Sequence, residues 1–125
     1  ISKFTKRILD GTPIQQYGDG NTARDYTYIE DIIDGIVAAS KYNKKSFDIF
    51  SRGGSATTKL SELINMIELA TCKQAIIEQM PDQLGDVPRT YADISKAQNS
   101  LGYTPQTPIA EGIEKYAQWL RESNT

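Results

Sequence analysis

Short strand-like stretches alternate with helical stretches along the whole of this chain. Extended structure is expected at residues 13–17, 24–28, 46–51 and 75–77, where strand-forming or alternating apolar residues lie between turn formers. Strands this short make an incomplete sheet on their own. Because strands and helices alternate, we predict an α/β or α+β-like fold, with a small mixed sheet and about five helices.

Helices are expected where apolar residues recur at helical spacing between capping residues. The last is the clearest, because Thr107 can cap it and Pro108 suits its first position. Thr58 and Asp93 are the expected N-caps of the third and fourth helices. Gly11 should end the first helix, and Gly102 the fourth. The expected apolar faces are Phe4 and Ile8; Ile29, Ile32, Ile33, Ile36 and Val37; Leu60, Leu63, Ile64 and Ile67; Ile94, Ala97 and Leu101; and Ile109, Ile113, Tyr116, Ala117 and Leu120.

The composition excludes several classes of function. Fourteen Lys and Arg against sixteen Asp and Glu give a net charge of −2, so no general basic field attracts nucleic acid or an anionic membrane surface. No apolar run approaches the roughly 18 residues of a membrane helix. One cysteine, Cys72, and the absence of histidine argue against disulfides and metal chemistry, and favour a cytoplasmic setting.

The groups needed for complete catalysis are missing from the sequence. No Gly-x-Gly-x-x-Gly spacing follows a strand and opens a helix, so no cradle for a dinucleotide pyrophosphate is predicted. None of the seven tyrosines has a lysine four positions later, so a Tyr-x-x-x-Lys pair for proton transfer is also absent. The first residues, Ile1 to Phe4, include no initiator Met and no signal sequence, so we expect the chain to begin within a longer protein. We therefore predict no catalytic residue and no NAD binding by this chain alone.

Residues 17–32 combine a glycine loop, a lone arginine and a strand that leads into a helix: YGDGNTARDYTYIEDI. An arginine at a loop edge offers planar, permanently charged donors that match phosphate oxygens in pairs. This pattern favours anion capture by Arg24. The alternative is a surface arginine that pairs with Asp25 or Asp31.

Four segments together resemble a known family. Residues 17–32, then FDIFSRGG at 47–54, QLGDVPRTYADISKA at 83–97 and LGYTP at 101–105, are similar to motifs of the extended short-chain dehydrogenases, in the same order. Among these NAD-dependent nucleotide-sugar epimerases and dehydratases, the third segment looks most like the UDP-glucuronate 4-epimerases. Ser51 departs from the pattern, since asparagine is usual there.

The resemblance implies roles for five residues. Arg24 would contact the nucleotide diphosphate and Asp86 the ribose hydroxyls. Arg89 would add a second positive charge, while Gln83 and Tyr17 would lie at the edge of the pocket, Tyr17 near the uracil. Three of them also have a simpler explanation. Asp86 could stabilise a turn, Arg89 could be a solvated surface charge, and Tyr17 could pack in the core.

The resemblance also implies a place in a larger enzyme. Residues 1–125 would form the carboxy-terminal domain that binds a UDP-sugar, and an amino-terminal Rossmann domain outside this chain would bind NAD and supply the catalytic groups. This chain would be inactive alone. It would either self-associate or be only moderately stable, because surface that the Rossmann domain covers would be exposed. Two alternatives stay open: a stand-alone module for weak nucleotide-sugar binding or protein interaction, and descent from a related dehydratase or decarboxylase.

Overall fold

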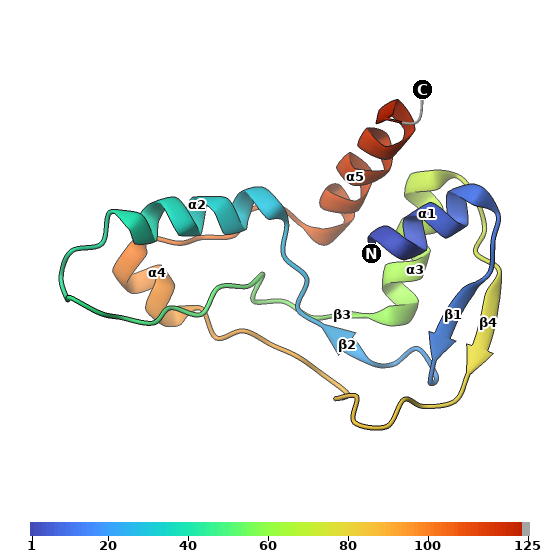
Figure 1. Cartoon of the computed structure of the whole chain (residues 1–125), viewed down its shortest axis with the longest axis horizontal. Helices are drawn as coiled ribbons and strands as arrows, with labels where there is room; N and C mark the ends of the chain where they lie inside the picture. Colours follow the sequence, from blue (N-terminus) through green and yellow to red (C-terminus); the bar gives the residue numbers. More distant parts are fainter. Residues whose placement is uncertain (124–125) are drawn as a thin grey trace.

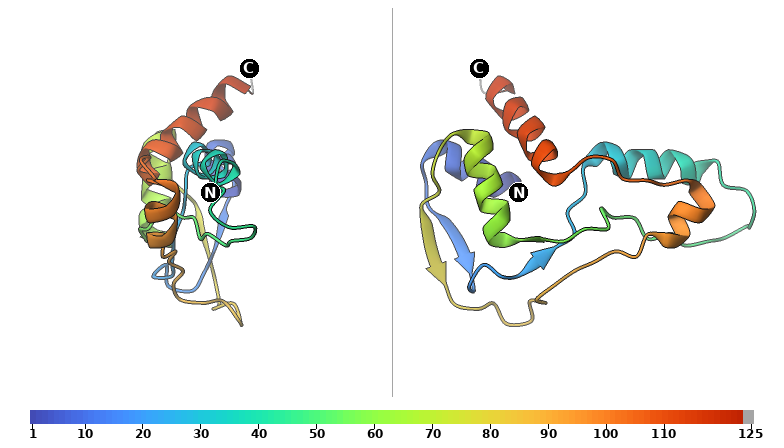
Figure 2. Two further views of the ribbon diagram at one scale, coloured as in Figure 1. Left: turned by 90° about the vertical axis from the view of Figure 1, so that its left-hand side faces the viewer. Right: turned by 180° about the vertical axis from the view of Figure 1, so that it is seen from behind.

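The computed structural model describes residues 1–123 and shows a bent molecule with a body and an arm (Figure 1). The body contains α1, α3, α5, β1 and β4; the arm contains α2, α4 and the segment between α2 and β3; β2 and β3 lie between them (Figures 1 and 2). The helices are α1 (Ser2–Asp10), α2 (Ile29–Ser40), α3 (Leu60–Thr71), α4 (Ser95–Leu101) and α5 (Ile109–Ser123). The strands are β1 (Ile14–Tyr17), β2 (Ala23–Arg24), β3 (Thr58–Lys59) and β4 (Ile77–Met80).

The strands form two separate pairs. β1 pairs with β4 in parallel, from Ile14 opposite Ile77 to Tyr17 opposite Met80. β2 pairs with β3 in antiparallel orientation, Ala23 opposite Lys59. The predicted mixture of about five helices with a few short strands is confirmed, although the strands are divided between two pairs rather than joined in one mixed sheet.

Two apolar clusters hold the molecule together. In the body, α1, β1, α3 and α5 bury six residues against one another: Ile8, Ile14, Leu63, Ile64, Ile67 and Ile113. In the arm, Ile94, Ala97 and Tyr103 form a smaller cluster beside Phe50. Tyr103 also donates a 2.9 Å hydrogen bond to the carbonyl oxygen of Gly53, which satisfies its buried hydroxyl. The body therefore holds the larger of the two apolar clusters.

The helix ends follow the sequence closely, with two corrections. Gly11 and Gly102 take left-handed conformations at the ends of α1 and α4. The N-cap of α3 is Lys59 rather than Thr58, because Thr58 is held in the ladder with β2. The N-cap of α4 is Ile94, while Asp93 still accepts the Ser95 backbone N–H at 3.0 Å.

The predicted strands are less accurate. The strand expected at 24–28 ends at Arg24, and the one expected at 75–77 lies at Ile77–Met80. The strand expected at 46–51 is wrong: this segment has alternating exposure but no ladder in the described part of the chain. A strand needs a partner for its backbone groups, and none of the strands in residues 1–123 pairs with this segment.

Helix α2 presents its apolar residues to the surface. Ile29 is 64% exposed, and Ile33, Ile36 and Val37 are each nearly half exposed. The residues that α2 buries are Asp31 and Gly35. Apolar periodicity correctly located this helix but did not identify the side that packs on the arm.

Among the described residues, no helix is both long and apolar enough to cross a membrane.

Candidate functional site

Arg24 and Asp86 meet where β2 runs beside the loop before α4. Nη2 of Arg24 lies 2.5 Å from Oδ1 of Asp86, and the two side chains are 26% and 44% exposed. Nη1 of Arg24 donates to the carbonyl oxygen of Ala23 at 2.9 Å. The guanidinium is thus held in one orientation at the surface, with a carboxylate beside it. Such a pair can offer donors to phosphate oxygens and an acceptor to hydroxyl groups.

Backbone hydrogen bonds place this loop against β2. The N–H of Ala23 donates to the carbonyl oxygen of Pro88 at 2.9 Å, and the N–H of Thr90 donates to that of Ala23 at 3.1 Å. Ala23 and Arg89 accordingly form an isolated parallel bridge. Residues 62 positions apart, Arg24 and Asp86, are brought together by these local contacts.

Arg89 lies beside this pair but faces an aromatic ring. Its guanidinium carbon is 5.6 Å from the centre of the Tyr91 ring, within the range of a cation–π contact. The Tyr91 hydroxyl is in turn 3.0 Å from Oγ of Ser55. The Arg89 guanidinium is thus placed over the Tyr91 ring, and its predicted role as a second positive charge at the site stays a prediction.

Tyr17 and Gln83 are placed apart from the Arg24–Asp86 pair. Tyr17 ends β1 and is 39% exposed, beside a surface hollow lined by Gly18, Asp19 and residues 79–82. Gln83 accepts the backbone N–H of Asp86 at 3.1 Å, which closes a turn. No hydrogen bond or ion pair among residues 1–123 joins either side chain to Arg24 or Asp86. Their predicted roles stay predictions.

The glycine loop between β1 and β2 is ordered by its own polar groups. Gly18 and Gly20 have φ values of 75° and 81°, which glycine adopts without strain. The Asp19 carboxylate accepts the side-chain N–H of Asn21 at 2.7 Å and its backbone N–H at 2.9 Å. The bond from the Asn21 side chain is the main reason that the pKa of Asp19 is lowered. The positive-φ glycines and the Asp19–Asn21 hydrogen bonds therefore fix the conformation of this loop.

Neither Asp25 nor Asp31 is the partner of Arg24. The Asp25 carboxylate accepts the backbone N–H groups of Gly54, Ser55 and Ala92. Asp31 is 6% exposed and accepts those of residues 106 and 107. Sequence reasoning missed both roles, although two glycines at 53 and 54 hinted that a side chain must approach that backbone closely.

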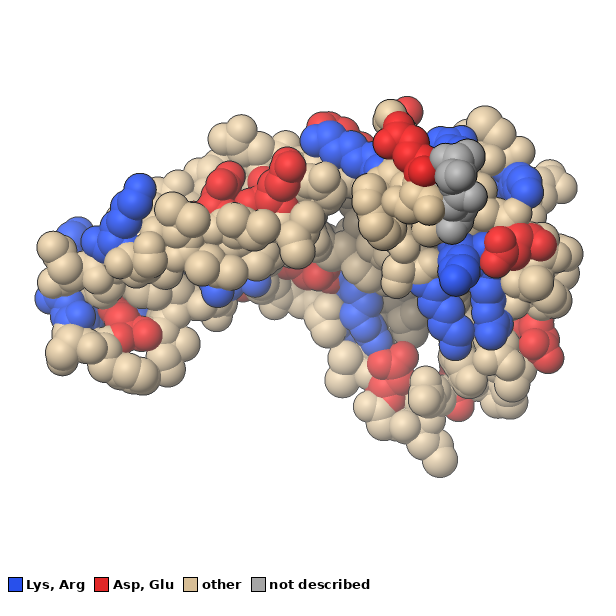
Figure 3. All heavy atoms as spheres, turned by 45° about the horizontal axis from the view of Figure 1, so that its top comes forward, with Lys and Arg blue, Asp and Glu red and all other residues tan. Residues whose placement is uncertain are grey.

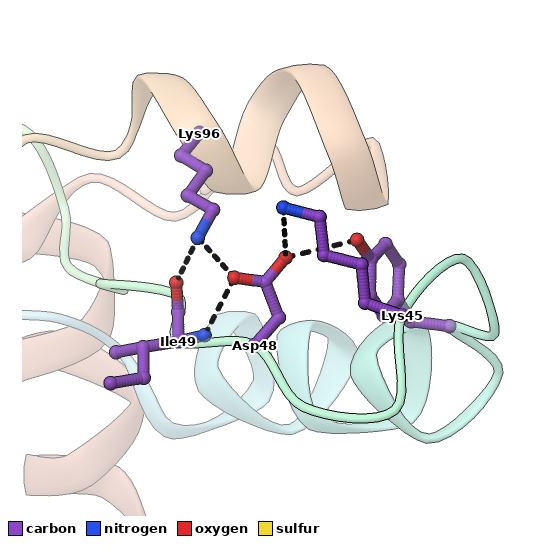
Figure 4. Close-up of polar contacts among 5 residues, drawn as sticks. Lys45, Asp48, Ile49 and Lys96 are labelled. Atoms are coloured by element: carbon purple, nitrogen blue, oxygen red, sulfur yellow. Dashed lines mark hydrogen bonds and ion pairs between the residues drawn. The ribbon is translucent and has the colours of Figure 1, made fainter.

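A second charged cluster lies in the arm (Figure 4). Lys96 binds the Asp48 carboxylate and donates to the carbonyl oxygen of Ile49 at 2.8 Å. Tyr42 donates to Asp48 at 2.9 Å, and Lys45 lies 3.8 Å from it. The Lys96 bond and then the Ile49 backbone N–H lower the pKa of Asp48 to about 2. These bonds tie the 46–51 segment to α4.

The described residues do not fit a dinucleotide or a metal ion. Gly18 and Gly20 follow β1 but lead into β2, so no helix N-terminus stands ready to receive a pyrophosphate there. In the part of the chain that the structure describes, no cluster of three carboxylate or thiol groups could hold a metal.

The charges of both signs are spread over arm and body, with several Lys and Arg groups gathered on the body (Figure 3).

Two curated relatives share this sequence over nearly its full length. An uncharacterised protein of Methanocaldococcus jannaschii is 46% identical over 123 residues, which are 97% of this chain and 37% of that protein. The UDP-glucuronate 4-epimerase of Thermodesulfobacterium geofontis is 36% identical over 124 residues, which are 98% of this chain and 38% of that enzyme. The chain therefore spans less than half the length of these relatives.

A solved structure and a family model agree with this relationship. The structure of UDP-glucuronic acid 4-epimerase from Bacillus cereus, in complex with UDP-glucuronic acid and NAD, matches with a TM-score of 0.87 and 32% identity. The match covers 96% of this chain and 38% of that one. The family model for GDP-mannose 4,6 dehydratase matches residues 1–116. The chain belongs to this family of NAD-dependent nucleotide-sugar epimerases and dehydratases, within the extended short-chain dehydrogenases.

Proposed function

We propose that this chain is the substrate-binding portion of a UDP-sugar 4-epimerase of the UDP-glucuronate or UDP-glucose type. Its task is to hold the nucleotide so that the sugar is correctly placed for chemistry performed elsewhere in the enzyme. Binding energy from a remote part of a substrate contributes to catalysis by fixing orientation. The observation that carries this proposal is the Arg24–Asp86 pair, fixed at the surface by contacts with a distant loop.

The two side chains would divide the nucleotide between them. Arg24 would donate to the diphosphate, and Asp86 would accept from the ribose hydroxyls, with Arg89 adding charge nearby. Support comes from the matched relatives, among which the Bacillus cereus enzyme was solved with UDP-glucuronic acid. Tyr17 and Gln83 would contribute only at the margin of the site.

In this proposal, residues 1–125 form one substrate-binding domain. A Rossmann domain outside this chain supplies NAD and the catalytic groups. The arm offers a surface for such a partner. The outer side of α2 is apolar and exposed, and Phe47 and Ile49 are 77% and 68% exposed. Seen in Figure 3, most of the arm is neither acidic nor basic. Surfaces of this kind mark interaction sites. The cytoplasmic location stays a prediction.

The same exposed arm favours one alternative, a stand-alone interaction module that has no use for a nucleotide. Calorimetric titration with UDP and UDP-glucuronate separates the two functions. Wild-type chain is expected to bind both, and Arg24→Ala is expected to weaken binding about tenfold or more, since hydrogen bonds to charged groups contribute about 1.5–3 kcal/mol. Arg121→Ala is the control, because it removes the same charge from exposed surface on α5. Equal affinity in both variants would contradict a nucleotide site at Arg24.

Catalysis is tested separately by adding the amino-terminal part of the Thermodesulfobacterium geofontis relative. We expect no epimerisation by the chain alone and measurable epimerisation of UDP-glucuronate by the mixture. Turnover by the lone chain would contradict the proposed division of work.

A further inference from the structure

Asp25 follows Arg24 in the chain and joins three segments that are distant in sequence. Its Oδ1 accepts the backbone N–H of Gly54 at 2.8 Å, and its Oδ2 accepts those of Ser55 at 3.1 Å and Ala92 at 3.0 Å. We propose that Asp25 is a positioning residue for the Arg24–Asp86 pair. By its bond to Ala92, it fixes the loop that carries Asp86 against the strand that carries Arg24. This inference rests on the nucleotide site proposed above and deepens it.

The carboxylate has almost no spare room. A Cβ added to Gly53 would lie 2.9 Å from Oδ2 of Asp25 and 2.5 Å from Cβ of Ala92. A Cβ added to Gly54 would lie 2.9 Å from Oδ1 and 2.7 Å from the carbonyl oxygen of Tyr26. The two glycines therefore allow the backbone to reach Asp25, and the three N–H bonds satisfy the carboxylate at both oxygens.

The geometry of Asp25 is transmitted to the pair through β2. The Asp25 backbone N–H donates to Oγ1 of Thr90 at 3.2 Å, next to the two backbone bonds that join Ala23 to Pro88 and Thr90. The bond from Ala92 to the Asp25 carboxylate closes this series at its far end. Residues 88–92 are thus attached along β2 on both sides of Arg24. Loss of the last bond frees one end of the attachment.

Ser55 shows that the carboxylate holds its neighbours under constraint. Its φ is 54°, in the left-handed region that residues other than glycine adopt infrequently. Such a conformation persists where surrounding contacts fix it. The Asp25 carboxylate supplies one of these contacts, and the Ser55 hydroxyl then lies 3.0 Å from that of Tyr91.

The test compares Asp25→Asn with Asp31→Asn in the full chain. Asparagine has the same shape but only one acceptor oxygen, so its amide N–H group must face at least one of the three backbone N–H donors that the carboxylate accepts. Asp31 is a matched control because it also accepts two backbone N–H groups, both at 3.0 Å, at a site that makes no contact with Arg24. The readouts are the side-chain ¹⁵N resonance of Arg24, amide hydrogen exchange along β2, and affinity for UDP.

We expect Asp25→Asn to shift the Arg24 resonance, to speed exchange at Ala23 and Thr90 about tenfold, and to weaken UDP binding to a similar degree. Asp31→Asn should lower the melting temperature but leave the Arg24 resonance, the amide exchange along β2 and the UDP affinity as in the wild type. Equal effects of the two variants, or an unchanged Arg24 resonance in Asp25→Asn, would overturn the positioning role.

Two further outcomes are decisive. If Asp25→Asn does not fold, Thr90→Val removes only the exposed hydroxyl that accepts the Asp25 N–H; it should give a smaller shift of the Arg24 resonance, and no shift would overturn the proposal. If the wild type does not bind UDP while the resonance and exchange changes occur, the proposed function of the isolated chain fails and the positioning role of Asp25 stands.

Discussion

Nη2 of Arg24 lies 2.5 Å from Oδ1 of Asp86, so the two side chains expected to bind a nucleotide sugar neutralise one another in this structure. Both are partly exposed, and an ion pair of this kind contributes at most about 1 kcal/mol to stability. Such a pair is easily opened. It keeps Arg24 oriented while leaving it available to an anion that approaches from solvent.

The first prediction concerns this competition. Asp86→Asn removes the negative charge beside Arg24, so the affinity for inorganic pyrophosphate should rise about twofold to fivefold, in line with a pair worth up to about 1 kcal/mol. The affinity for UDP should rise less or fall, because the ribose loses a charged acceptor. Calorimetric titration at low ionic strength measures both. Asp82→Asn, an exposed acid in the same loop, is the control. An unchanged or lower affinity for pyrophosphate would contradict the pairing.

The second prediction uses the pKa of Asp48, which Lys96 and the Ile49 N–H lower to about 2 from an ordinary value of 3.8. A carboxyl group with a lowered pKa in the folded state stabilises the protein above its unfolded pKa, and this stability is lost as the pH falls toward the folded pKa. The difference in melting temperature between wild type and Asp48→Asn should therefore be full above about pH 4 and shrink toward pH 2. Thermal unfolding at several pH values checks this. A melting-temperature difference that stays constant down to pH 2 would contradict the stabilising role of the Asp48 carboxylate.

The third prediction compares two apolar residues of α3. Ile67 is fully buried in the body, whereas Leu69 is 79% exposed. Ile67→Ala leaves a cavity and should lower the free energy of unfolding by about 2–5 kcal/mol. Leu69→Ala should change it by less than about 0.5 kcal/mol. Urea unfolding with an unchanged m value is the measurement, and similar losses in both variants would show that the body is not packed as described.

The helices could be predicted because their signals are local. Apolar spacing and terminal glycines identified α1, α4 and α5 within a few residues. The strands are shorter than expected because their partners come from far along the chain: Ile14 pairs with Ile77, and Arg24 with Thr58. Local sequence does not determine whether a strand-like segment pairs with another strand. Residues 46–51 pair with none of the described strands.

The site, like the fold, combines local signals that the sequence carries with long-range contacts that it does not reveal. A motif on the chain pointed to Arg24 and Asp86, but their mutual contact depends on a loop that closes over 62 residues. The competing hypothesis paired Arg24 with Asp25 or Asp31, which are near in sequence. Both of these carboxylates accept backbone N–H groups instead. Local spacing indicates which residues are available, and tertiary contacts decide which of them meet.

The fourth prediction concerns the apolar side of α2. Ile29, Ile33, Ile36 and Val37 follow helical spacing on one side of the helix and are 45–64% exposed. Within the described residues, the adjacent 46–51 segment has no strand partner for its backbone groups, which favours pairing with another chain. Without a covering domain, we expect the isolated chain to self-associate as its concentration rises.

Ile33→Lys combined with Val37→Lys places two like charges on this surface and should shift the chain toward monomer in sedimentation velocity. Leu69→Lys is the control, since Leu69 is the more exposed residue but lies on α3 in the body. Both variants leave the buried clusters intact, so their melting temperatures should stay close to that of the wild type. A wild-type chain that is monomeric at every concentration would show that α2 tolerates its exposure without a partner, and would weaken the case for a docking surface on the arm.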